Sequence, residues 1–415
     1  MKSEWITQRL SEIVDFNPRE SLPKGGLAKK IPMDALQPYC RDIPTYEVTE
    51  FNGGTKFRNG DTIMARITPC LENGKTAQVN ILGNDEIGFG STEFIVFRAK
   101  KGISDPDYIY YLVSSPLVRD PSIKSMVGSS GRQRVQTDVV QGLQVPVPPL
   151  EEQRKIAGIL RTLDDKIKLN TEINKNLEEQ AVVLFRSWFS AFSLSPNSPR
   201  VNSEFGEIPE DFAVVKVGSL PMLVTDYVAN GSFASLKANV NLYQEPNYAY
   251  FIRNTDLKSG SFGVFVDQHS YEFLSKSTLY GGEIIISNVG DVGSVFLCPK
   301  LDGRMTLGNN IIMLRPEDDH LRYYLYVWFK YFQGQALIQG IKGGSAQPKF
   351  NKTDFKNTSV LIPPKDILTR FHETVAPMFE TISQRQAETS RLADLRDTLL
   401  PQLMSGEIDV SDLDL

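Results

Sequence analysis

The longest regular pattern of apolar positions covers residues 150–188. Steps of four and three residues from Ile156 reach, in order, Leu160, Leu163, Ile167, Asn170, Asn174, Leu177, Ala181, Leu184 and Trp188. A seam held over more than four heptads predicts a long amphipathic helix that packs against another helix. Asn170 and Asn174 lie at its middle, and polar residues there usually determine register and partner. We therefore expect a partner helix that is also polar at its middle.

A second copy of the pattern follows at a constant offset of 215 residues. At this offset Gly128 matches Gly343, and the proline pair at 148–149 matches the pair at 363–364. The second seam consists of Phe371, Val375, Met378, Ile382, Arg385, Thr389, Leu392, Arg396, Leu399 and Leu403. It is also apolar at both ends and polar at the middle, so we expect the two helices to pair within one chain.

Antiparallel pairing that aligns the two polar middles determines the expected register. Asn170 then faces Thr389, and Asn174 faces Arg385. At the ends of the seams, the expected contacts are those of Ile156 with Leu403 and of Trp188 with Phe371. The two helices would form an intramolecular coiled coil.

Short β-branched and aromatic runs precede the first long helix and alternate with Gly and Asn turns, as in a small sheet-rich domain. The predicted strands cover residues 62–65, 77–82 and 94–97, and a short helix is predicted over 107–113. The second copy repeats this plan, because residues 282–287 echo 60–65 and residues 323–329 echo the short helix.

These patterns predict an α+β protein with two similar mixed α/β domains separated by two long antiparallel helices. The expected boundaries are 1–149 for the first domain, 150–192 for the first helix, 193–205 for a linker rich in Ser, Pro and Asn, 206–364 for the second domain, 365–406 for the second helix and 407–415 for an acidic tail. A chain of 415 residues is long enough for two or three domains.

Composition narrows the class of protein. A formal net charge of -5 argues against indiscriminate coating of nucleic acid, but it allows a locally basic face. The three cysteines lie far apart without a CxxC, so neither a disulfide framework nor a zinc cluster is predicted. No apolar run reaches about 18 residues, and the first residues lack the apolar segment of a signal peptide. We expect a soluble, cytoplasmic protein without a membrane partner.

Motifs for catalysis are missing from the sequence. It contains neither GxxxxGK[ST] for a nucleoside triphosphate nor GxGxxG for a dinucleotide. The tripeptide at 17–19, Asn-Pro-Arg, lacks the second proline and the aromatic residue of the adenine methyltransferase tetrapeptide, so it is interpreted as a turn. We predict no catalytic residue, no metal site and no cofactor bound by this chain.

Two basic, glycine-rich loops at 128–134 and 343–349 precede the long helices. Arginine can bind two acceptors of guanine, glutamine can do the same for adenine, and hydroxyls can bind phosphates. A solvated surface loop is the simpler interpretation of one such segment, but its occurrence twice favours DNA binding. The candidate DNA-binding residues are Lys56, Arg58, Arg66, Lys124, Ser129, Arg132, Gln133, Arg134, Arg253, Arg304, Lys342, Ser345, Gln347, Lys349 and Lys352.

Several segments together resemble the specificity subunits of type I restriction-modification enzymes. Residues 148–157, PPLEEQRKIA, resemble their central conserved region, and residues 399–408, LLPQLMSGEI, resemble their C-terminal conserved region. Residues 206–209, GEIP, are similar to the start of their second recognition domain. The resemblance covers essentially the whole chain. It departs at residues 365–369, where KDILT replaces the LEEQ form.

The resemblance implies two target recognition domains, each reading one half of a split, asymmetric sequence in double-stranded DNA. It also implies that two modification subunits, which bind S-adenosylmethionine and methylate adenine, dock on this chain. Two restriction subunits that use ATP and Mg complete the nuclease. A seam over 156–188 is roughly 50 Å long at 1.5 Å per residue, which is about 14 base pairs. The helices would therefore set the gap between the two readers.

Two alternatives remain at this point. A coiled-coil scaffold whose domains bind protein without DNA specificity would explain the helices but not the basic loops. A DNA-modifying enzyme that acts alone is disfavoured by the absent catalytic motifs.

Overall fold

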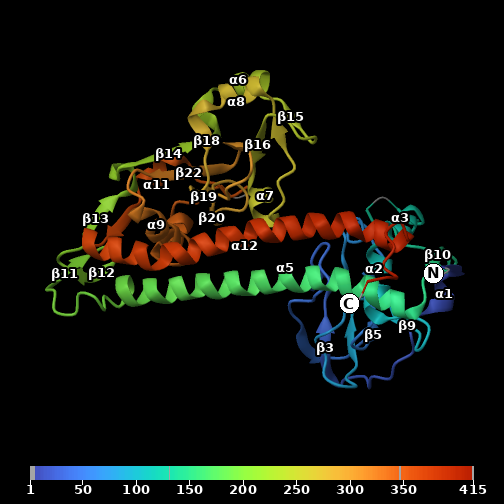
Figure 1. The fold of residues 1–415 in the computed structure, drawn as a ribbon. Helices are drawn as coiled ribbons and strands as arrows, with labels where there is room; N and C mark the ends of the chain where they lie inside the picture. Colours follow the sequence, from blue (N-terminus) through green and yellow to red (C-terminus); the bar gives the residue numbers. More distant parts are fainter. Residues whose placement is uncertain (1–4, 130, 345–346, 414–415) are drawn as a thin grey trace. The chain divides into compact units, whose positions relative to one another are not determined.

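The computed structural model describes residues 5–129, 131–344 and 347–413 (Figure 1). The chain divides into two compact units. Unit 1 comprises residues 1–168 and 391–415, and unit 2 comprises residues 169–390. Each unit contains one sheet-bearing domain, here called domain 1 (residues 5–149) and domain 2 (residues 206–364), together with segments of both long helices. The expected α+β class, with the domain and helix occurring twice, is confirmed.

Domain 1 contains two four-stranded sheets, in the orders β2-β9-β6-β7 and β4-β3-β8-β5, and a two-stranded sheet, β1-β10. The strands are β1 Ile6–Arg9, β2 Val14–Phe16, β3 Leu27–Ile31, β4 Glu47–Glu50, β5 Thr55–Phe57, β6 Thr62–Ala65, β7 Thr76–Gln78, β8 Gly88–Gly90, β9 Phe94–Ala99 and β10 Gln144–Val147. The helices are α1 Leu10–Ile13, η1 Met33–Ala35, α2 Pro106–Ser114, α3 Pro116–Lys124 and α4 Thr137–Gln141. The predicted strands at 62–65 and 94–97 and the predicted short helix are confirmed. The strand predicted over 77–82 is wrong beyond Gln78, because β7 covers Thr76–Gln78.

Helix α2 connects the sheets of domain 1 to the long helices. It begins where Asp105 accepts hydrogen bonds from the amides of Asp107 and Tyr108, with Pro106 at the first helical position. Its residues from Tyr108 to Val113 are all buried. These six consecutive residues lie on more than one side of the helix, as expected for a helix enclosed between a sheet and other helices.

Domain 2 contains a four-stranded sheet, β14-β22-β19-β20, a five-stranded sheet, β15-β17-β16-β21-β18, and two strand pairs, β13-β23 and β11-β12. Its strands are β11 Arg200–Ser203, β12 Gly206–Pro209, β13 Ala213–Lys216, β14 Met222–Asp226, β15 Leu242–Tyr243, β16 Ala249–Ile252, β17 Phe265–Val266, β18 Thr278–Leu279, β19 Ile284–Ser287, β20 Val295–Leu297, β21 Arg304–Leu307, β22 Ile311–Pro316 and β23 Ser359–Ile362. Its helices are η3 Val217–Ser219, η4 Tyr227–Asn230, α6 Phe233–Asn239, α7 Asn254–Ser259, α8 Gln268–Phe273, η5 Ser275–Ser277, α9 His320–Tyr331, α10 Gln333–Gly340 and α11 Lys352–Lys356.

The repeat predicted from the sequence is visible in the strand pairing. β1 pairs antiparallel with β10 in domain 1, and β13 pairs antiparallel with β23 in domain 2. β6 lies between β9 and β7, and β19 lies between β22 and β20. Helix α9 follows β22 as helix α2 follows β9. The two domains therefore share one strand order around β6 and β19.

Helices α5 (Leu150–Phe185) and α12 (Lys365–Ser405) are the two long helices (Figure 1). A π-helical turn, η2, follows α5 over Arg186–Ser190. In unit 1, Ile156 and Leu403 are both buried in one hydrophobic cluster, as the antiparallel register requires. In unit 2, the rings of Trp188 and Phe371 lie 5.9 Å apart. Both ends of the predicted seam therefore have their expected surroundings.

The polar middle of the seam lies in unit 2. Asn170 is fully buried, and its amide nitrogen lies 3.4 Å from the Thr389 hydroxyl, its expected partner. Arg385 donates to Asn170 at 2.9 Å rather than to Asn174, its expected partner one helical turn away. The Arg385 guanidinium is long enough to reach Asn170, which is more deeply buried than Asn174. Asn170 therefore contacts both Arg385 and Thr389.

The predicted linker and the predicted acidic tail are more ordered than the sequence indicated. Residues 200–203 of the expected linker form β11, which pairs with β12. The expected acidic tail packs onto unit 1, where Val410 is fully buried and the carbonyl of Ser411 accepts from Lys155 at 2.8 Å. Apolar residues interspersed among the carboxylates explain why this tail folds back, since Val410 and Ile408 join the core of unit 1.

Candidate nucleic-acid interface

The glycine-rich loop of domain 1 is a hairpin whose ends pair with each other. The backbone amides of Val127 and Arg134 each donate to the carbonyl of the other, at 3.0 and 2.9 Å. The exit of the hairpin also pairs with the segment after β6, because Thr68 donates to Gln133 at 3.1 Å and Val135 donates to Arg66 at 2.9 Å. We call residues 66–68 together with 127–129 and 131–135 loop seat 1.

Domain 2 contains the same arrangement. The backbones of Gly343 and Lys349 exchange hydrogen bonds of 2.9 Å. Gly290 donates to Pro348 at 2.9 Å, and Phe350 donates to Asn288 at 3.0 Å. We call residues 288–290 together with 343–344 and 347–350 loop seat 2. The loop exits of the two seats match at the 215-residue offset, so Arg134 and Lys349 occupy equivalent positions.

Sequence reasoning found the two hairpins but missed the segments against which they pack. These segments follow β6 and β19, which the repeat had already matched as 60–65 and 282–287. The signal was therefore present, because a functional loop is often placed by the end of a buried strand.

Glycine is required at the narrow points of both hairpins. Gly128 has φ +136°, and a Cβ there would lie 2.9 Å from the carbonyl oxygen of Arg132. Gly344 has φ +86°, and a Cβ there would lie 2.7 Å from the carbonyl oxygen of Gln347. A side chain at either position would meet backbone and require a strained conformation. The glycines therefore give each loop one tight shape.

Three of the predicted cations are available for a ligand at or beside the seats. Lys124, Arg132 and Lys349 are exposed. Within the part of the chain that the structure describes, none of these three side chains forms a hydrogen bond or an ion pair. Lys124 ends helix α3 just before the first hairpin, Arg132 is inside it, and Lys349 ends the second hairpin. Each seat therefore presents at least one positive charge to solvent.

Arg134, also predicted to bind DNA, is paired with a carboxylate of domain 1. Its Nη2 lies 2.7 Å from Oε1 of Glu93, and its Nε lies 3.0 Å from both carboxylate oxygens. The hydrogen bond from Arg134 holds the pKa of Glu93 below its usual range. Glu93 precedes β9, so this bidentate pair ties the hairpin to the sheet.

The other predicted DNA-binding cations also contact groups of the protein itself, which are carboxylates, a backbone carbonyl, a side-chain amide or an aromatic ring. Arg58 forms a bidentate pair with Glu20, at 2.6 and 2.8 Å. Further contacts of this kind are those of Arg253 with Asp256 at 2.6 Å, Lys352 with Asp226 at 2.9 Å, Lys56 with the carbonyl of Glu20 at 2.8 Å, Arg66 with Glu93 at 3.9 Å, Lys342 with Gln339 at 3.2 Å, and Arg304 with the ring of Tyr248 at 4.5 Å. Each of these contacts lies within one domain.

The remaining predicted residues lie in the hairpins. Ser129 and Gln347 are exposed, and Gln133 is partly buried. Ser345 lies outside the described residues. Seat 1 therefore has the hydroxyl of Ser129 and the amide of Gln133 beside its cations, and seat 2 has the amide of Gln347.

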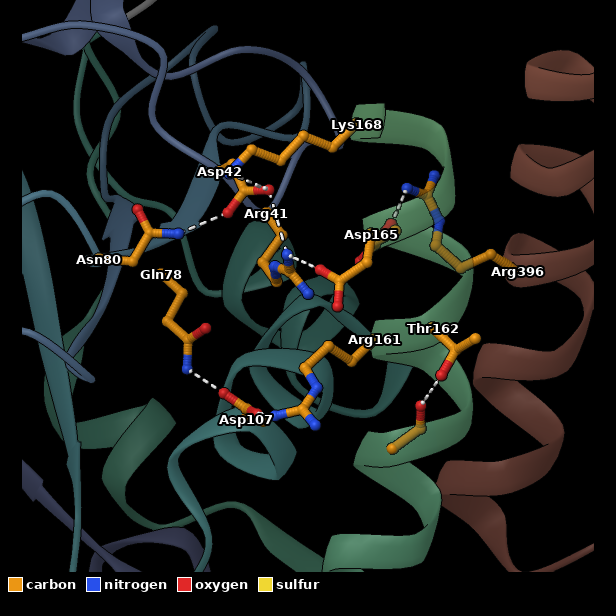
Figure 2. Close-up of polar contacts among 12 residues, drawn as sticks. Arg41, Asp42, Gln78, Asn80, Asp107, Arg161, Thr162, Asp165, Lys168 and Arg396 are labelled. Atoms are coloured by element: carbon orange, nitrogen blue, oxygen red, sulfur yellow. Dashed lines mark hydrogen bonds and ion pairs between the residues drawn. The ribbon is translucent and has the colours of Figure 1, made fainter. Parts of the chain in front are cut away.

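Polar side chains on helix α5 contact polar side chains of domain 1. Figure 2 shows these contacts. Arg41 is only 7% exposed and donates to Asp165 at 2.6 Å. Arg161 donates to Asp107 at 3.0 Å, and Lys168 lies 3.8 Å from Asp42. Sequence reasoning missed these contacts, since their partners are between 54 and 126 positions apart by residue number.

Two general features of the chain bear on the class of site. Within residues 5–129, 131–344 and 347–413, no group of three or more His, Cys, Asp or Glu side chains could hold a metal ion. Among the described residues, no helix combines the length and apolar content needed to cross a membrane. What the two domains offer is a pair of matching, polar, cationic loop seats. The fold is that of a binding protein with an internal repeat and one loop seat in each of its two similar domains.

Comparison with known proteins identifies the family. Residues 2–179 and 209–388 match the type I restriction modification DNA specificity domain. The chain belongs to this family.

Two curated relatives span most of the chain. It is 28% identical over 317 residues to the type I restriction enzyme MjaIX specificity subunit of Methanocaldococcus jannaschii, covering 74% of this chain and 70% of the relative. It is 26% identical over 412 residues to the HindI specificity subunit of Haemophilus influenzae, covering 85% and 87%. The S subunit of a type I restriction-modification system from M. genitalium has a similar fold, with a TM-score of 0.55, 15% identity and coverage of 97% and 96%.

Proposed function

We propose that this chain is the DNA sequence-recognition subunit of a type I restriction-modification enzyme. Domain 1 reads one half of a bipartite, asymmetric target in double-stranded DNA, and domain 2 reads the other half. The observation that carries this proposal is the duplicated loop seat, in which two matching hairpins present Arg132 and Lys349 to solvent. Two similar sites with different side chains suit a target whose halves differ.

The chemistry of the seats supports recognition rather than catalysis. Arg132 and Gln133 offer donors for acceptors on base edges, while the hydroxyl of Ser129 suits phosphate oxygens. The backbone hydrogen bonds between the exit of each hairpin and the segment after a strand restrain that end of the loop, which lowers the entropy lost when DNA binds. The net charge of -5 fits a protein that binds DNA through local patches.

The partners follow from membership of the family. We propose that two modification subunits dock on the chain and supply S-adenosylmethionine and adenine methylation. Two restriction subunits, which use ATP and Mg, would complete the enzyme. This chain then supplies specificity, the paired helices set the spacing of the two readers, and the site of action is the cytoplasm, where the DNA is. The alternative of a protein-binding scaffold is not favoured by the family match.

One experiment tests the proposed function directly. Genomic DNA from cells with and without this chain, each expressing the modification subunit, is sequenced for methylated adenines. We expect a single bipartite motif that is methylated only when the chain is present. Methylation without a shared motif, or methylation that does not depend on the chain, would refute the proposal. Weak dependence of DNA binding on salt would favour the scaffold, because phosphate contacts make binding fall steeply with salt.

A further inference from the structure

A buried tyrosine joins domain 1 to helix α5. The hydroxyl of Tyr111 on α2 donates to Oδ2 of Asp164 at 2.7 Å, and the two side chains are 2% and 6% exposed. Arg396 on α12 donates to the other oxygen, Oδ1, at 2.8 Å. Burial and the negative charge of Asp164 raise the pKa of the Tyr111 hydroxyl, so it stays protonated and remains a donor.

Domain 2 uses a tyrosine at the same position of the repeat. Tyr326 on α9 lies 215 residues after Tyr111, and its hydroxyl donates to Oε1 of Glu178, also on α5. Lys330 donates to the same Glu178 oxygen at 2.7 Å. Each domain therefore places one tyrosine hydroxyl on one carboxylate of α5, and a cation completes each group.

The carboxylates are not copies of each other in the repeat. At the 215-residue offset, Asp164 corresponds to Phe379 and Glu178 corresponds to Ala393. The tyrosine–carboxylate bond is thus present in both units although its acceptor comes from different positions of the repeat. An aromatic surface alone can shift along a helix, whereas a hydrogen bond to a buried carboxylate fixes direction as well as distance.

Helix α2 transmits the position of Tyr111 to loop seat 1. Ser115 lies between α2 and α3. Its backbone N–H and its side-chain hydroxyl both donate to carbonyls in the last turn of α2. At the far end of α3, Ser125 accepts from the backbone and the side chain of Gln136, which directly follows the seat.

Helix α9 is linked to loop seat 2 in a comparable way. Helix α10 follows α9 directly and ends just before the second hairpin. Gln335 on α10 donates to the carbonyls of Phe329 on α9 and of Gly293, the latter at 2.8 Å. Gly293 itself donates to Ser287, the residue before seat 2. A rotation of α9 would therefore move the seat.

Building on the proposed function, we propose that Tyr111 and Tyr326 are positioning residues for DNA recognition. Each hydroxyl orients its own domain on α5 and, through α2 or α9, determines how accurately the nearby loop seat reads its half of the target. Neither tyrosine contacts DNA in this proposal. The two bonds act separately, one for each half-site.

The chain supplies matched controls on the same two helices. Tyr108 on α2 is fully buried, and its hydroxyl bonds to the carbonyl of Pro146 within domain 1 at 3.4 Å. Tyr324 on α9 is fully buried, and its hydroxyl donates to the carbonyl of Leu361 within domain 2. Tyr→Phe removes one oxygen at each of the four positions. Only Tyr111→Phe and Tyr326→Phe also remove a hydrogen bond to α5.

The test uses the full-length chain assembled with its modification subunit. The methylation kcat/KM is measured on the target duplex and on duplexes with one base pair changed in either half. We expect Tyr111→Phe to lower discrimination at the first half about fivefold, as one lost hydrogen bond would, and to leave the second half unchanged. Tyr326→Phe gives the opposite result, and the Tyr108→Phe and Tyr324→Phe controls change neither half.

A measurement without DNA separates this inference from the proposed function. Amide hydrogen exchange should be faster at Val135 in Tyr111→Phe and at Phe350 in Tyr326→Phe, with both controls like the wild type. Unchanged discrimination and exchange in the two variants would overturn the inference, as would equal losses at both half-sites. A wild-type protein without any sequence discrimination would instead refute the proposed function, and the exchange data would still test the positioning.

Discussion

Arg385 donates a hydrogen bond from Nη1 to Oδ1 of Asn170 at 2.9 Å, between two helices that are 215 positions apart in the sequence. The amide nitrogen of Asn170 donates to Glu388 at 2.8 Å and lies 3.4 Å from the Thr389 hydroxyl. A buried asparagine with several partners disfavours other registers, because any shift leaves it unsatisfied. Asn170 is therefore the residue that determines how α5 and α12 align in unit 2.

Asn170→Ala should lower the free energy of unfolding by roughly 1–3 kcal/mol, since it removes hydrogen bonds to buried polar partners. Asn174→Ala is the matched control. Oδ1 of Asn174 has no hydrogen-bond partner in the described part of the chain, so we expect a change of less than about 0.5 kcal/mol. Denaturant unfolding of the full-length chain measures both values. Equal losses in the two variants would show that Asn170 has no special role.

Arg132→Ala should impair reading of one half-site, and Lys349→Ala should impair reading of the other. Each side chain is exposed and belongs to a different loop seat. Loss of a base contact costs roughly 1–3 kcal/mol, or about tenfold in binding. Loss of a phosphate contact would instead weaken all duplexes and reduce the salt slope by about 0.9. Binding titrations with duplexes altered in one half distinguish these results, and a variant that affects both halves equally would contradict independent reading.

Arg134 and Glu93 should behave as one unit in a double-mutant cycle. If Arg134 anchors the hairpin, Glu93→Ala and Arg134→Ala each weaken binding at the first half-site, and the double variant is no worse than either. If Arg134 contacted DNA directly, Glu93→Ala would leave binding unchanged or improve it, because a nearby negative charge is lost. Lys349, at the equivalent position of domain 2, has no such carboxylate partner among the described residues.

The anchoring of loop seat 1 should weaken in acid. The pKa of Glu93 is lowered in the folded protein by the hydrogen bond from Arg134. A carboxyl with a depressed pKa contributes stability above its unfolded value, about 4.3 for Glu, and loses it as pH falls through the folded value. Hydrogen exchange at Val135, corrected for the intrinsic effect of pH, should therefore show constant protection near neutrality and a loss below about pH 4. Glu93→Gln should abolish this pH dependence.

The sequence by itself determined the architecture of this protein. The heptad seam and the 215-residue repeat are regularities along the chain, and each follows from the geometry of a helix or from the duplication of a domain. They were sufficient to predict both long helices, their antiparallel pairing, the strand at 62–65, the short helix α2 and the two glycine-rich loops. The alternation of apolar residues specifies such local features before any long-range contact forms.

Only the tertiary structure decided which charged groups face a ligand. Arg58 and Arg134 looked like Arg132 in the sequence, but folding brings Glu20 and Glu93 to them from 38 and 41 residues away. The hydrogen bonds from Tyr111 and Tyr326 to α5 were also not predicted from the sequence, because their acceptors lie at different positions of the repeat. Charge pairing depends on distance in space and on burial, and neither is encoded in the spacing of residues along the chain.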